Sequence, residues 1–500
     1  LWSGYDLPLL FNPRISLGQV LKKFMKVHGS TTAQICDDSG EKMSYNDMWL
    51  KTVRAAQNLQ KLGYRKGDVF GFSGIHRHLA PVIYAAFSLG CPVNTLSPGF
   101  GKADLIYLLN ITKPKLMFCT DERYELVAEC LKELGNDARI FTFGGGVNGS
   151  DSVEYLFAQT GQEHTFLPVP VEANDIAAIL TSSGTTGLAK GVALSHSSIA
   201  EKCNDVGHIN LGDIHYCPGS FYWISGLYIS VLSVIHGATA VTTNKKFSAE
   251  LQLRLVEQYK VTFLMNSPQY LVMMLKNEAI KTTDLSSVKC YFVGGNRVPA
   301  GAPAEINKYL PNGRMYTGYG LTEISFILTS TFDEPIESDS SGKVVHGSEV
   351  KIIDDNGARC GVGVNGEICI KNRHQFLFYY GNEKATAETI DNEGFVLTGD
   401  VGHFDADGYL YIVDRLKDVL KFYLSKVYPS EIESFLINLP DIESVCVVGI
   451  PHQTFGDLPG AAVVRKTNSR ITEEDIQEMV SSPSDSLSSF QFSSASSVRY

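Results

Sequence analysis

The stretch Thr181–Gly191 reads TSSGTTGLAKG and directly follows the apolar run Ile176–Leu180. An apolar run of that length predicts a buried strand, so the small hydroxylated residues and glycines leave the strand as a loop. Such a loop turns backbone N–H groups and hydroxyls toward a phosphate, and Lys190 adds a positive charge. It is not a Walker loop, because the spacing from glycine to Gly-Lys-Ser/Thr is absent. Taken alone, the loop is equally compatible with a flexible Ser/Gly turn.

Three further motifs follow along the chain: GYGLTE at Gly318–Glu323, TGD at Thr398–Asp400 and DRLKD at Asp414–Asp418. A carboxylate is a poor electrophile, and ATP activates it when a carboxylate oxygen attacks the α-phosphorus and pyrophosphate departs. A site for that reaction must neutralise phosphate charge, hold a magnesium ion and fix the adenosine. A carboxylate beside a hydroxyl, as in Thr322-Glu323, suits a hard cation. The four motifs together predict a site that binds ATP and activates a carboxylate.

As a set, the motifs resemble the adenylate-forming superfamily of acyl-CoA synthetases, 4-coumarate–CoA ligases and beetle luciferases, over the region from Glu41 to Val480. The resemblance implies that ATP contacts the loop residues Thr181, Ser182, Ser183, Gly184, Thr185, Thr186, Gly187 and Lys190. It also implies that Tyr319 stacks on the adenine, that Gly320 lies in the same nucleotide site, and that Thr322 contacts the α-phosphate. Glu323 would bind the magnesium ion.

The same resemblance implies two further nucleotide contacts. Asp400 would accept hydrogen bonds from the ribose hydroxyls, and Arg415 would reach the same sugar, although alone they read as surface or ion-pair residues. Gly294 and Gly295 resemble a strand edge where the adenine and the acyl chain pass close to the backbone. Asn296-Arg297 departs from the small residues that are usual there.

The acyl pocket is expected around Phe221–Gly226, with Trp223 and Gly226 as its named residues. Trp223 stands near the position where many relatives carry histidine, so an apolar and partly filled pocket is expected. An aromatic residue there is equally consistent with packing in the core. The residues do not identify the carboxylic acid.

Three residues within or just after the fourth motif concern the later half-reaction: Lys417, Lys421 and Leu424. Lys417 matches the hinge about which the C-terminal domain of relatives rotates, and Lys421 matches a catalytic lysine on a hairpin. Together with Lys190 and Thr322, Lys421 completes the expected catalytic set, although solvated surface lysines are the alternative. Leu424 stands where relatives have a glycine that lines the tunnel for CoA. Its four extra carbons are expected to obstruct the thiol.

Apolar runs of strand length alternate with helical patterns from Asp68 to Phe143 and again from Val261 to Thr317, which predicts an α/β fold with mainly parallel sheets. Short strands parted by Gly, Asn and Asp follow from Gly347 to Asp414. We therefore expect a large N-terminal domain of two αβα layered subdomains plus a small β-rich subdomain, then a small, incomplete α+β C-terminal domain. In that last domain, Ser430 and Glu433 read as a capping box, and Thr472 reads as the cap of another helix.

The expected boundaries are an AMP-binding N-terminal domain at 1–414, a partial C-terminal AMP-binding domain at 415–480, and a tail at 481–500. Half of the tail is serine and none of it is lysine, so it is expected to be disordered. Relatives use a C-terminal lysine for adenylation, and losing such a charge is expected to slow that step by roughly 10²- to 10³-fold. The start at Leu1-Trp2 lacks both a methionine and a signal peptide, so the N-terminus is expected to be clipped.

The composition of the chain limits the classes of binding partner and the cellular compartments that are expected for the protein. The 500 residues carry a net charge of −11, which argues against a nucleic-acid partner. The ten cysteines lack metal-binding spacing, as expected for free thiols in a reducing compartment. The longest apolar stretch, Gly226–Val241, is broken by polar residues and predicts a buried helix and strand rather than a membrane span. We expect an intracellular protein, peroxisomal by family resemblance or cytoplasmic, although Val498-Arg499-Tyr500 is no peroxisomal tripeptide.

The expected function is that of an acid–thiol ligase. It would use ATP, Mg²⁺ and CoA to convert a small-molecule carboxylic acid, fatty or aryl, into an acyl-adenylate and then a CoA thioester. The tail and Leu424 would impair that activity. Two alternatives stay open: a luciferase-like oxygenase, and a non-catalytic paralogue that binds a nucleotide or an acyl group. The sequence leaves the oligomeric state open.

Overall fold

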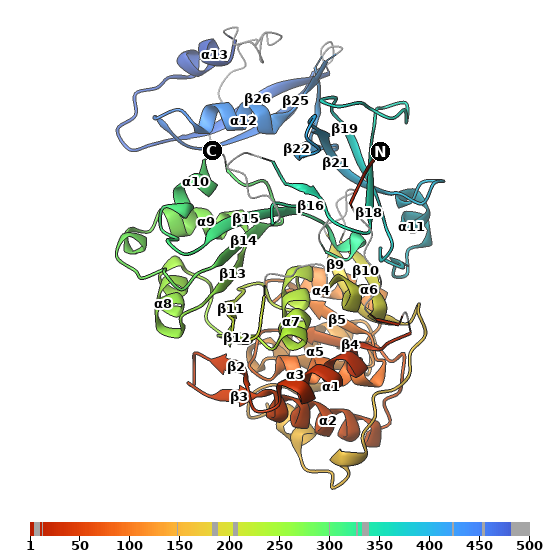
Figure 1. Ribbon diagram of the computed structural model, residues 1–500. Helices are drawn as coiled ribbons and strands as arrows, with labels where there is room; N and C mark the ends of the chain where they lie inside the picture. The colour runs from red at the N-terminus through yellow and green to blue at the C-terminus, as the bar shows by residue number, and fades with distance from the viewer. Residues whose placement is uncertain are drawn as a thin grey trace. The chain divides into compact units, whose positions relative to one another are not determined.

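The computed structural model describes residues 1–4, 11–12, 14–147, 149–182, 189–203, 209–299, 301–326, 329–332, 340–422, 425–452 and 456–481 (Figure 1). The chain divides into two compact units. The first contains Leu1–Val350 and Ile370–Leu397, and the second contains Lys351–Cys369 and Thr398–Tyr500. The boundaries expected at residues 414 and 480 stay predictions.

An eight-stranded sheet in the first unit has the order β20-β10-β9-β5-β4-β6-β7-β8. Its strands are β4 (Phe70–Ser73), β5 (Val93–Leu96), β6 (Leu116–Cys119), β7 (Arg139–Thr142), β8 (Asp151–Ser152), β9 (Ile176–Ser182), β10 (Lys190–Ser195) and β20 (Phe378–Tyr379). Strands β4 to β8 and the β5–β9 pair are parallel, whereas β10 is antiparallel to both β9 and β20. The predicted alternation of strands and helices is therefore confirmed here.

A nine-stranded sheet, also in the first unit, has the order β17-β16-β15-β14-β13-β11-β12-β2-β3. Its strands are β2 (Thr32–Cys36), β3 (Lys42–Ser44), β11 (Ile214–Tyr216), β12 (Thr239–Thr242), β13 (Phe263–Asn266), β14 (Cys290–Gly294), β15 (Arg314–Tyr319), β16 (Thr329–Ser330) and β17 (Lys343–Val344). From β2 to β15 the neighbouring strands are parallel. The α/β fold class is thus confirmed in both sheets.

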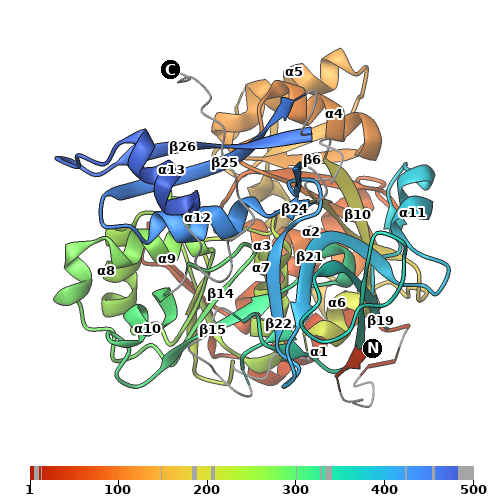
Figure 2. The ribbon, with the colours of Figure 1, turned by 90° about the horizontal axis from the view of Figure 1, so that it is seen from above.

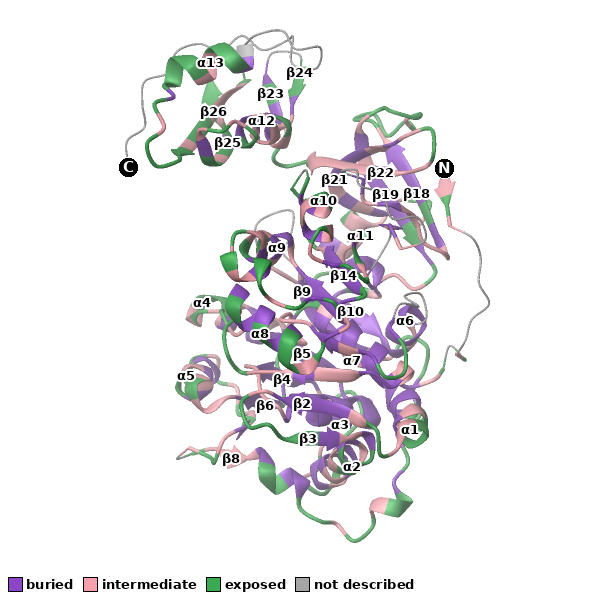
Figure 3. Ribbon diagram, turned by 60° about the vertical axis from the view of Figure 1, so that its left-hand side comes forward, coloured by how far each residue is buried: buried purple, intermediate pink, exposed green. Residues whose placement is uncertain are grey.

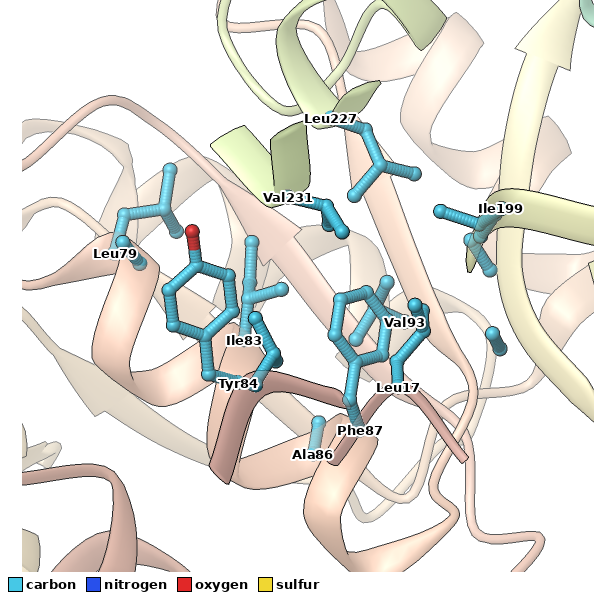
Figure 4. Close-up of a cluster of buried hydrophobic side chains, with 14 of the residues drawn as sticks. Leu17, Leu79, Ile83, Tyr84, Ala86, Phe87, Val93, Ile199, Leu227 and Val231 are labelled. Carbon is cyan, nitrogen blue, oxygen red and sulfur yellow. The ribbon is translucent and has the colours of Figure 1, made fainter. Parts of the chain in front are cut away.

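Buried helices share one hydrophobic core with both sheets. They are α1 (Leu17–His28), α2 (Tyr45–Lys61), α3 (Leu79–Leu89), α6 (His196–Lys202) and α7 (Ile224–His236). All eleven residues of α3 are buried, as expected of a helix that is apolar all round. Figure 4 shows Leu17 of α1, Phe87 of α3 and Leu227 of α7 among the side chains of this core. The sequence patterns had not predicted α1 or α2.

Other helices cover the remaining face of each sheet. Helices α4 (Lys102–Thr112) and α5 (Tyr124–Glu133) pack on β6 through Leu105, Met117 and Val127 (Figure 2). Three more pack on β13 to β15: α8 (Ala249–Tyr259), α9 (Pro268–Leu275) and α10 (Ala302–Asn307). In Figure 3, β2 is drawn as buried and α8 carries exposed residues. This layering is the one expected of two αβα subdomains.

The β-rich segment forms a five-stranded sheet of order β1-β18-β19-β21-β22. Its strands are β1 (Trp2–Ser3), β18 (Ser348–Ile353), β19 (Gly366–Asn372), β21 (Val396–Phe404) and β22 (Leu410–Arg415), and α11 (Glu383–Thr389) lies between β20 and β21 in the sequence. The short strands predicted between Gly347 and Asp414 are confirmed as β18, β19, β21 and β22. The division into units falls within β18, β19 and β21.

The rest of the second unit is α+β. A four-stranded sheet, β24-β23-β26-β25, contains β23 (Leu420–Phe422), β24 (Ser425–Val427), β25 (Ile442–His452) and β26 (Gly456–Arg465). Helices α12 (Pro429–Ile437) and α13 (Glu473–Ser481) pack on it through Leu436, Val447 and Val480 (Figure 2). This compact piece has the expected class.

The capping box predicted at Ser430 is wrong, whereas the helix cap predicted at Thr472 is confirmed. Helix α12 begins at Pro429, two residues before the start that a Ser430 cap would give, with a proline in its first turn and no side-chain cap. The Ser430 hydroxyl instead donates to the carbonyl of Val413, and Glu433 Oε1 accepts the N–H of Val447 at 2.8 Å. Tertiary contacts therefore take both side chains. Thr472 Oγ1 accepts the N–H of Asp475 at 3.1 Å, as a cap should.

All ten cysteines are free, as expected from their spacing. Gly226–Val241 falls on α7 and β12, which confirms the predicted helix and strand. Within the described ranges, no helix has both the length and the apolar character needed to cross a bilayer.

Two buried histidines predict acid sensitivity of the fold. Burial lowers the pKa of His196 and of His215 to about 4, against about 6.5 in an unfolded chain. Both imidazoles are neutral in the folded protein. Their contribution to the free energy of unfolding is therefore fully present above pH 6.5 and is lost as the pH falls toward 4. Each site that binds a proton only after unfolding adds up to about 1.4 kcal/mol per pH unit to the slope, and burial lowers the pKa of His78 to about 3 in the same way.

Urea unfolding between pH 7 and pH 5 measures this slope. His215→Gln is expected to lower the slope by up to about 1.4 kcal/mol per pH unit, while His164→Gln, at an exposed position, serves as the control. A slope that neither substitution changes would contradict the assignment to buried histidines.

Candidate active site

The ends of the Thr181–Gly191 loop are held by a β-hairpin. The antiparallel register of β9 and β10 pairs Ser182 with Lys190, and Thr181 with Gly191. The predicted strand before the loop is confirmed, because β9 spans Ile176–Ser182. The predicted phosphate contacts Ser183, Gly184, Thr185, Thr186 and Gly187 lie outside the described residues. The hairpin thus fixes where the chain enters and leaves the loop.

Glu323 of the second motif lies against this hairpin. It belongs to the short 3-10 helix η5 (Thr322–Ile324), and it is buried. Its Oε1 accepts a hydrogen bond from Ser182 Oγ at 2.9 Å. Its backbone carbonyl accepts the N–H of Phe376 at 2.7 Å. The fold therefore brings together two motifs that are 141 residues apart.

Tyr379 completes this group and was not predicted from the sequence. Its hydroxyl donates to Glu323 Oε1 at 2.9 Å, and Lys190 Nζ lies 4.6 Å from the centre of its ring. Burial and the nearby Glu323 charge raise the pKa of Tyr379, so its hydroxyl stays protonated as a donor. We refer to Ser182, Lys190, Glu323 and Tyr379 as the Glu323 cluster.

The sequence carried little signal for Tyr379. Its strand β20 is only two residues long, and its position depends on antiparallel pairing with Val192 of β10. A two-residue strand has no periodicity to detect. The pairing partner lies far away in the sequence, so only the folded chain reveals it.

The predicted glycine pair lies beside the second motif. The parallel register of β14 and β15 pairs Gly294 with Gly318. A Cβ on Gly294 would lie 2.8 Å from the Gly318 carbonyl oxygen, so the two backbones approach more closely than a side chain allows. Gly295 has φ +94°, which also favours glycine. Tyr319 ends β15, and Gly320 and Thr322 follow it, half-buried.

Asp400 and Arg415 form an ion pair in the second unit. Strands β21 and β22 place them opposite each other, and Arg415 Nε lies 2.8 Å from Asp400 Oδ1. Asp400 is buried, whereas Arg415 is exposed. Glu367, which was not predicted, accepts the N–H of Gly399 at 3.0 Å, and burial raises the pKa of its carboxyl. The pair presents a carboxylate and a guanidinium, both of which suit hydroxyl recognition.

The two predicted lysines of the second unit are exposed. Lys417 lies in the turn after β22, and Lys421 lies on β23. The N–H of Lys421 donates to Asp457 Oδ2 at 3.0 Å. Leu424 lies outside the described residues. The roles of both lysines stay predictions.

Trp223 does not pack in the core. It precedes α7, its side chain is 56% exposed, and its ring lies 4.7 Å from that of Tyr222 at an interplanar angle of 67°. Packing in the core, one of the two explanations left open by the sequence, is therefore excluded. The other, a wall of the acyl pocket, stays a prediction.

Gly226 is a point of close backbone contact. A Cβ there would lie 2.1 Å from the carbonyl oxygen of Ser220 and 2.4 Å from that of Gly219. Backbone atoms cannot move aside easily, so Gly226→Ala is expected to lower the free energy of unfolding by about 1–3 kcal/mol. Denaturant titration measures this loss, with Gly361→Ala as control because a Cβ there meets nothing within 4 Å. Equal stability of the two variants would show that α7 shifts at little cost.

The Glu323 cluster offers one carboxylate to a cation. Of the described residues, none donates a hydrogen bond to Glu323 Oε2, since Ser182 and Tyr379 both use Oε1. The described part of the chain contains no group of three or more His, Cys, Asp or Glu that would hold a metal alone. This donor set fits Mg²⁺, which favours one or two carboxylates together with phosphate oxygens and water.

The model of the AMP-binding enzyme family matches residues 21–380, and that of the AMP-binding enzyme C-terminal domain matches residues 431–493. The chain belongs to this family of adenylate-forming enzymes.

Curated relatives are CoA ligases. A 4-coumarate–CoA ligase of Humulus lupulus is 32% identical over 463 residues, which cover 89% of this chain and 83% of the relative. A 4-coumarate–CoA ligase of Arabidopsis thaliana is 32% identical over 466 residues, covering 89% and 82%. By this resemblance the chain is an acid–thiol ligase of the acyl- or aryl-CoA ligase group.

Solved structures agree on the fold. The luciferase-like enzyme from the nonluminescent mealworm Zophobas morio matches with a TM-score of 0.78 and 28% identity, covering 83% of this chain and 99% of that one. An anthranilate CoA ligase in complex with anthranoyl-AMP matches with a TM-score of 0.84 and 23% identity, covering 95% and 90%. The expected large α/β domain and smaller C-terminal domain are confirmed.

Proposed function

We propose that this chain activates a carboxylic acid, fatty or aryl, with Mg²⁺ and ATP, and then transfers the acyl group from AMP to CoA. The observation that carries the proposal is the convergence of Ser182 and Tyr379 on the Glu323 carboxylate, next to Lys190. One negative and one positive side chain thereby contact the same tyrosine, where the chain enters and leaves a loop whose sequence is rich in hydroxyls. That combination suits a magnesium–triphosphate ligand.

The residues have distinct roles in this proposal. Lys190 neutralises charge on the phosphates, with hydrogen bonds from Thr181, Ser182 and the following loop. Thr322 contacts the α-phosphate, where the carboxylate attacks, and electrostatic stabilisation of that developing charge lowers the barrier. Glu323 would hold the magnesium ion, whose chemistry is to offset the charge of the phosphate oxygens.

The second group of residues serves the nucleoside and the acyl chain. Asp400 and Arg415 hold the ribose, while Tyr319, Gly294 and Gly295 border the adenine. Trp223 and Gly226 border the acyl group. Lys417 acts as the hinge and Lys421 serves the alternative conformation of the catalytic cycle.

Pyrophosphate exchange tests the first half-reaction. Purified protein, Mg²⁺, ATP and labelled pyrophosphate are combined with a panel of fatty acids and hydroxycinnamic acids. Exchange that depends on one class of acid and on Mg²⁺ is the expected result. Binding of ATP without exchange for any acid would instead favour the non-catalytic paralogue.

A luciferase-like oxygenase is the second candidate, and the 28% identity to the mealworm luciferase-like enzyme favours it. Both candidates begin with adenylation, so only the second half-reaction separates them. A product that requires CoA supports the ligase. A product that requires oxygen supports the oxygenase.

Leu424 provides a selective test of the second half-reaction. If its side chain obstructs the CoA thiol, Leu424→Gly is expected to speed thioester formation while leaving acyl-adenylate formation unchanged, because glycine removes four carbons from the wall. Single-turnover assays of each half-reaction measure both rates, with Leu167→Gly, at an exposed position outside every motif, as a control. Equal thioester rates with and without Leu424→Gly would show that the path is open.

A further inference from the structure

Tyr379 lies outside all four sequence motifs, yet it contacts two members of the Glu323 cluster. Its hydroxyl donates a hydrogen bond to Glu323 Oε1, and Lys190 Nζ lies over the face of its ring. The side chain of Tyr379 is buried. Its backbone N–H donates to Thr386 Oγ1 at 3.0 Å, which anchors the end of β20. A backbone hydrogen bond therefore fixes the position of Tyr379, while its side chain contacts both Glu323 and Lys190.

The two hydrogen bonds on Glu323 are unevenly shared between its oxygens. Ser182 and Tyr379 both donate to Oε1, each at 2.9 Å, and no described residue donates to Oε2. Two donors on one oxygen fix the rotation of the carboxylate, because hydrogen bonds to a charged acceptor are strong and directional. Oε2 is thereby the oxygen that remains for a cation.

The ring of Tyr379 acts on Lys190 at the same time. At 4.6 Å from the ring centre, the ammonium group is within the range of a cation–π interaction. No ion pair joins Lys190 to Glu323 among the described residues, although both contact the same tyrosine. The aromatic ring thus holds the ammonium without pairing it with the Glu323 carboxylate.

We infer that Tyr379 is a positioning residue that keeps Glu323 and Lys190 oriented and apart, so that the carboxylate is available to magnesium and the ammonium to phosphate. This inference rests on the proposed function and adds a residue to it. Without the hydroxyl, Glu323 can rotate. Without the ring, Lys190 can reach the Glu323 carboxylate. The two side chains would then form an ion pair with each other, and neither charge would be available to the magnesium ion or the phosphates.

Two substitutions separate these effects. Tyr379→Phe removes the hydroxyl and keeps the ring, so the Mg²⁺ concentration for half-maximal ATP binding is expected to rise roughly 10- to 100-fold, the scale for one hydrogen bond to a charged group. ATP affinity at saturating Mg²⁺ should change little. Tyr379→Leu removes the ring as well, and ATP affinity should then fall a further roughly 3- to 10-fold even at saturating Mg²⁺.

Calorimetric titration of ATP at several Mg²⁺ concentrations measures both quantities without relying on turnover. Tyr380→Phe, at the neighbouring tyrosine, is the matched control and should behave as the wild type. A purely structural role would lower the melting temperature of Tyr379→Phe without moving its Mg²⁺ dependence, and that result would overturn the inference. Wild-type protein that binds no Mg²⁺–ATP would overturn the proposed function together with it.

Discussion

Glu323→Gln is expected to reduce carboxylate-dependent pyrophosphate exchange by roughly 10²- to 10³-fold, the scale observed when one electrostatic stabiliser of a transition state is removed. Glutamine is nearly isosteric, and its amide oxygen can still accept hydrogen bonds from Ser182 and Tyr379. The fold should therefore persist. What is lost is the negative charge that would hold the magnesium ion near the phosphates.

The measurement is initial-rate exchange at saturating ATP over a range of Mg²⁺ concentrations. Glu305→Gln serves as the control, because Glu305 of α10 pairs with Lys308, the residue after that helix, outside the Glu323 cluster. Exchange within threefold of wild type in Glu323→Gln would show that another group binds the cation. The magnesium assignment would then have to be abandoned, although the family membership would stand.

Asp400→Asn is expected to weaken ATP binding by roughly 10- to 100-fold. In the proposal, the carboxylate accepts two ribose hydroxyls, and hydrogen bonds to a charged acceptor contribute about 1.5–3 kcal/mol each. An amide offers one acceptor and no charge. The substitution also removes the ionic partner of Arg415, whose Nε lies 2.8 Å from Asp400 Oδ1.

Calorimetry with ATP and with a 2′,3′-dideoxy analogue separates the two effects. If Asp400 binds the ribose hydroxyls, the wild type should bind the analogue weakly, and Asp400→Asn should lose little further affinity for it. Asp407→Asn, in the exposed turn between β21 and β22, provides the control. An equal loss for ATP and for the analogue would assign Asp400 to the ion pair alone.

The two largest effects concern residues that the motifs had already predicted. Glu323 and Asp400 belong to short runs with a fixed order, and such runs encode local chemistry directly: a hydroxyl next to a carboxylate, or a carboxylate after a glycine. The alternating apolar runs likewise predicted β4, β6, β7 and the strands from β13 to β15, because a buried parallel strand needs a continuous apolar stretch on both faces.

Other features depended on contacts between distant parts of the chain. Tyr379 reaches Glu323 only because β20 pairs with β10, and a two-residue strand leaves no pattern in the sequence. Ser430 matched a capping box, but its hydroxyl bonds Val413 across 17 residues, so a tertiary partner displaced the local one. Trp223 is exposed despite its size.

Local motifs thus specified which chemical groups the chain possesses, since propensity, apolar periodicity and residue order act over a few neighbours. The folded arrangement specified which of those groups meet. A hydrogen bond such as that from Ser182 to Glu323 depends on the packing of two sheets on shared helices, and that packing energy is distributed over the whole core. No short stretch of sequence therefore encodes which of these groups come into contact.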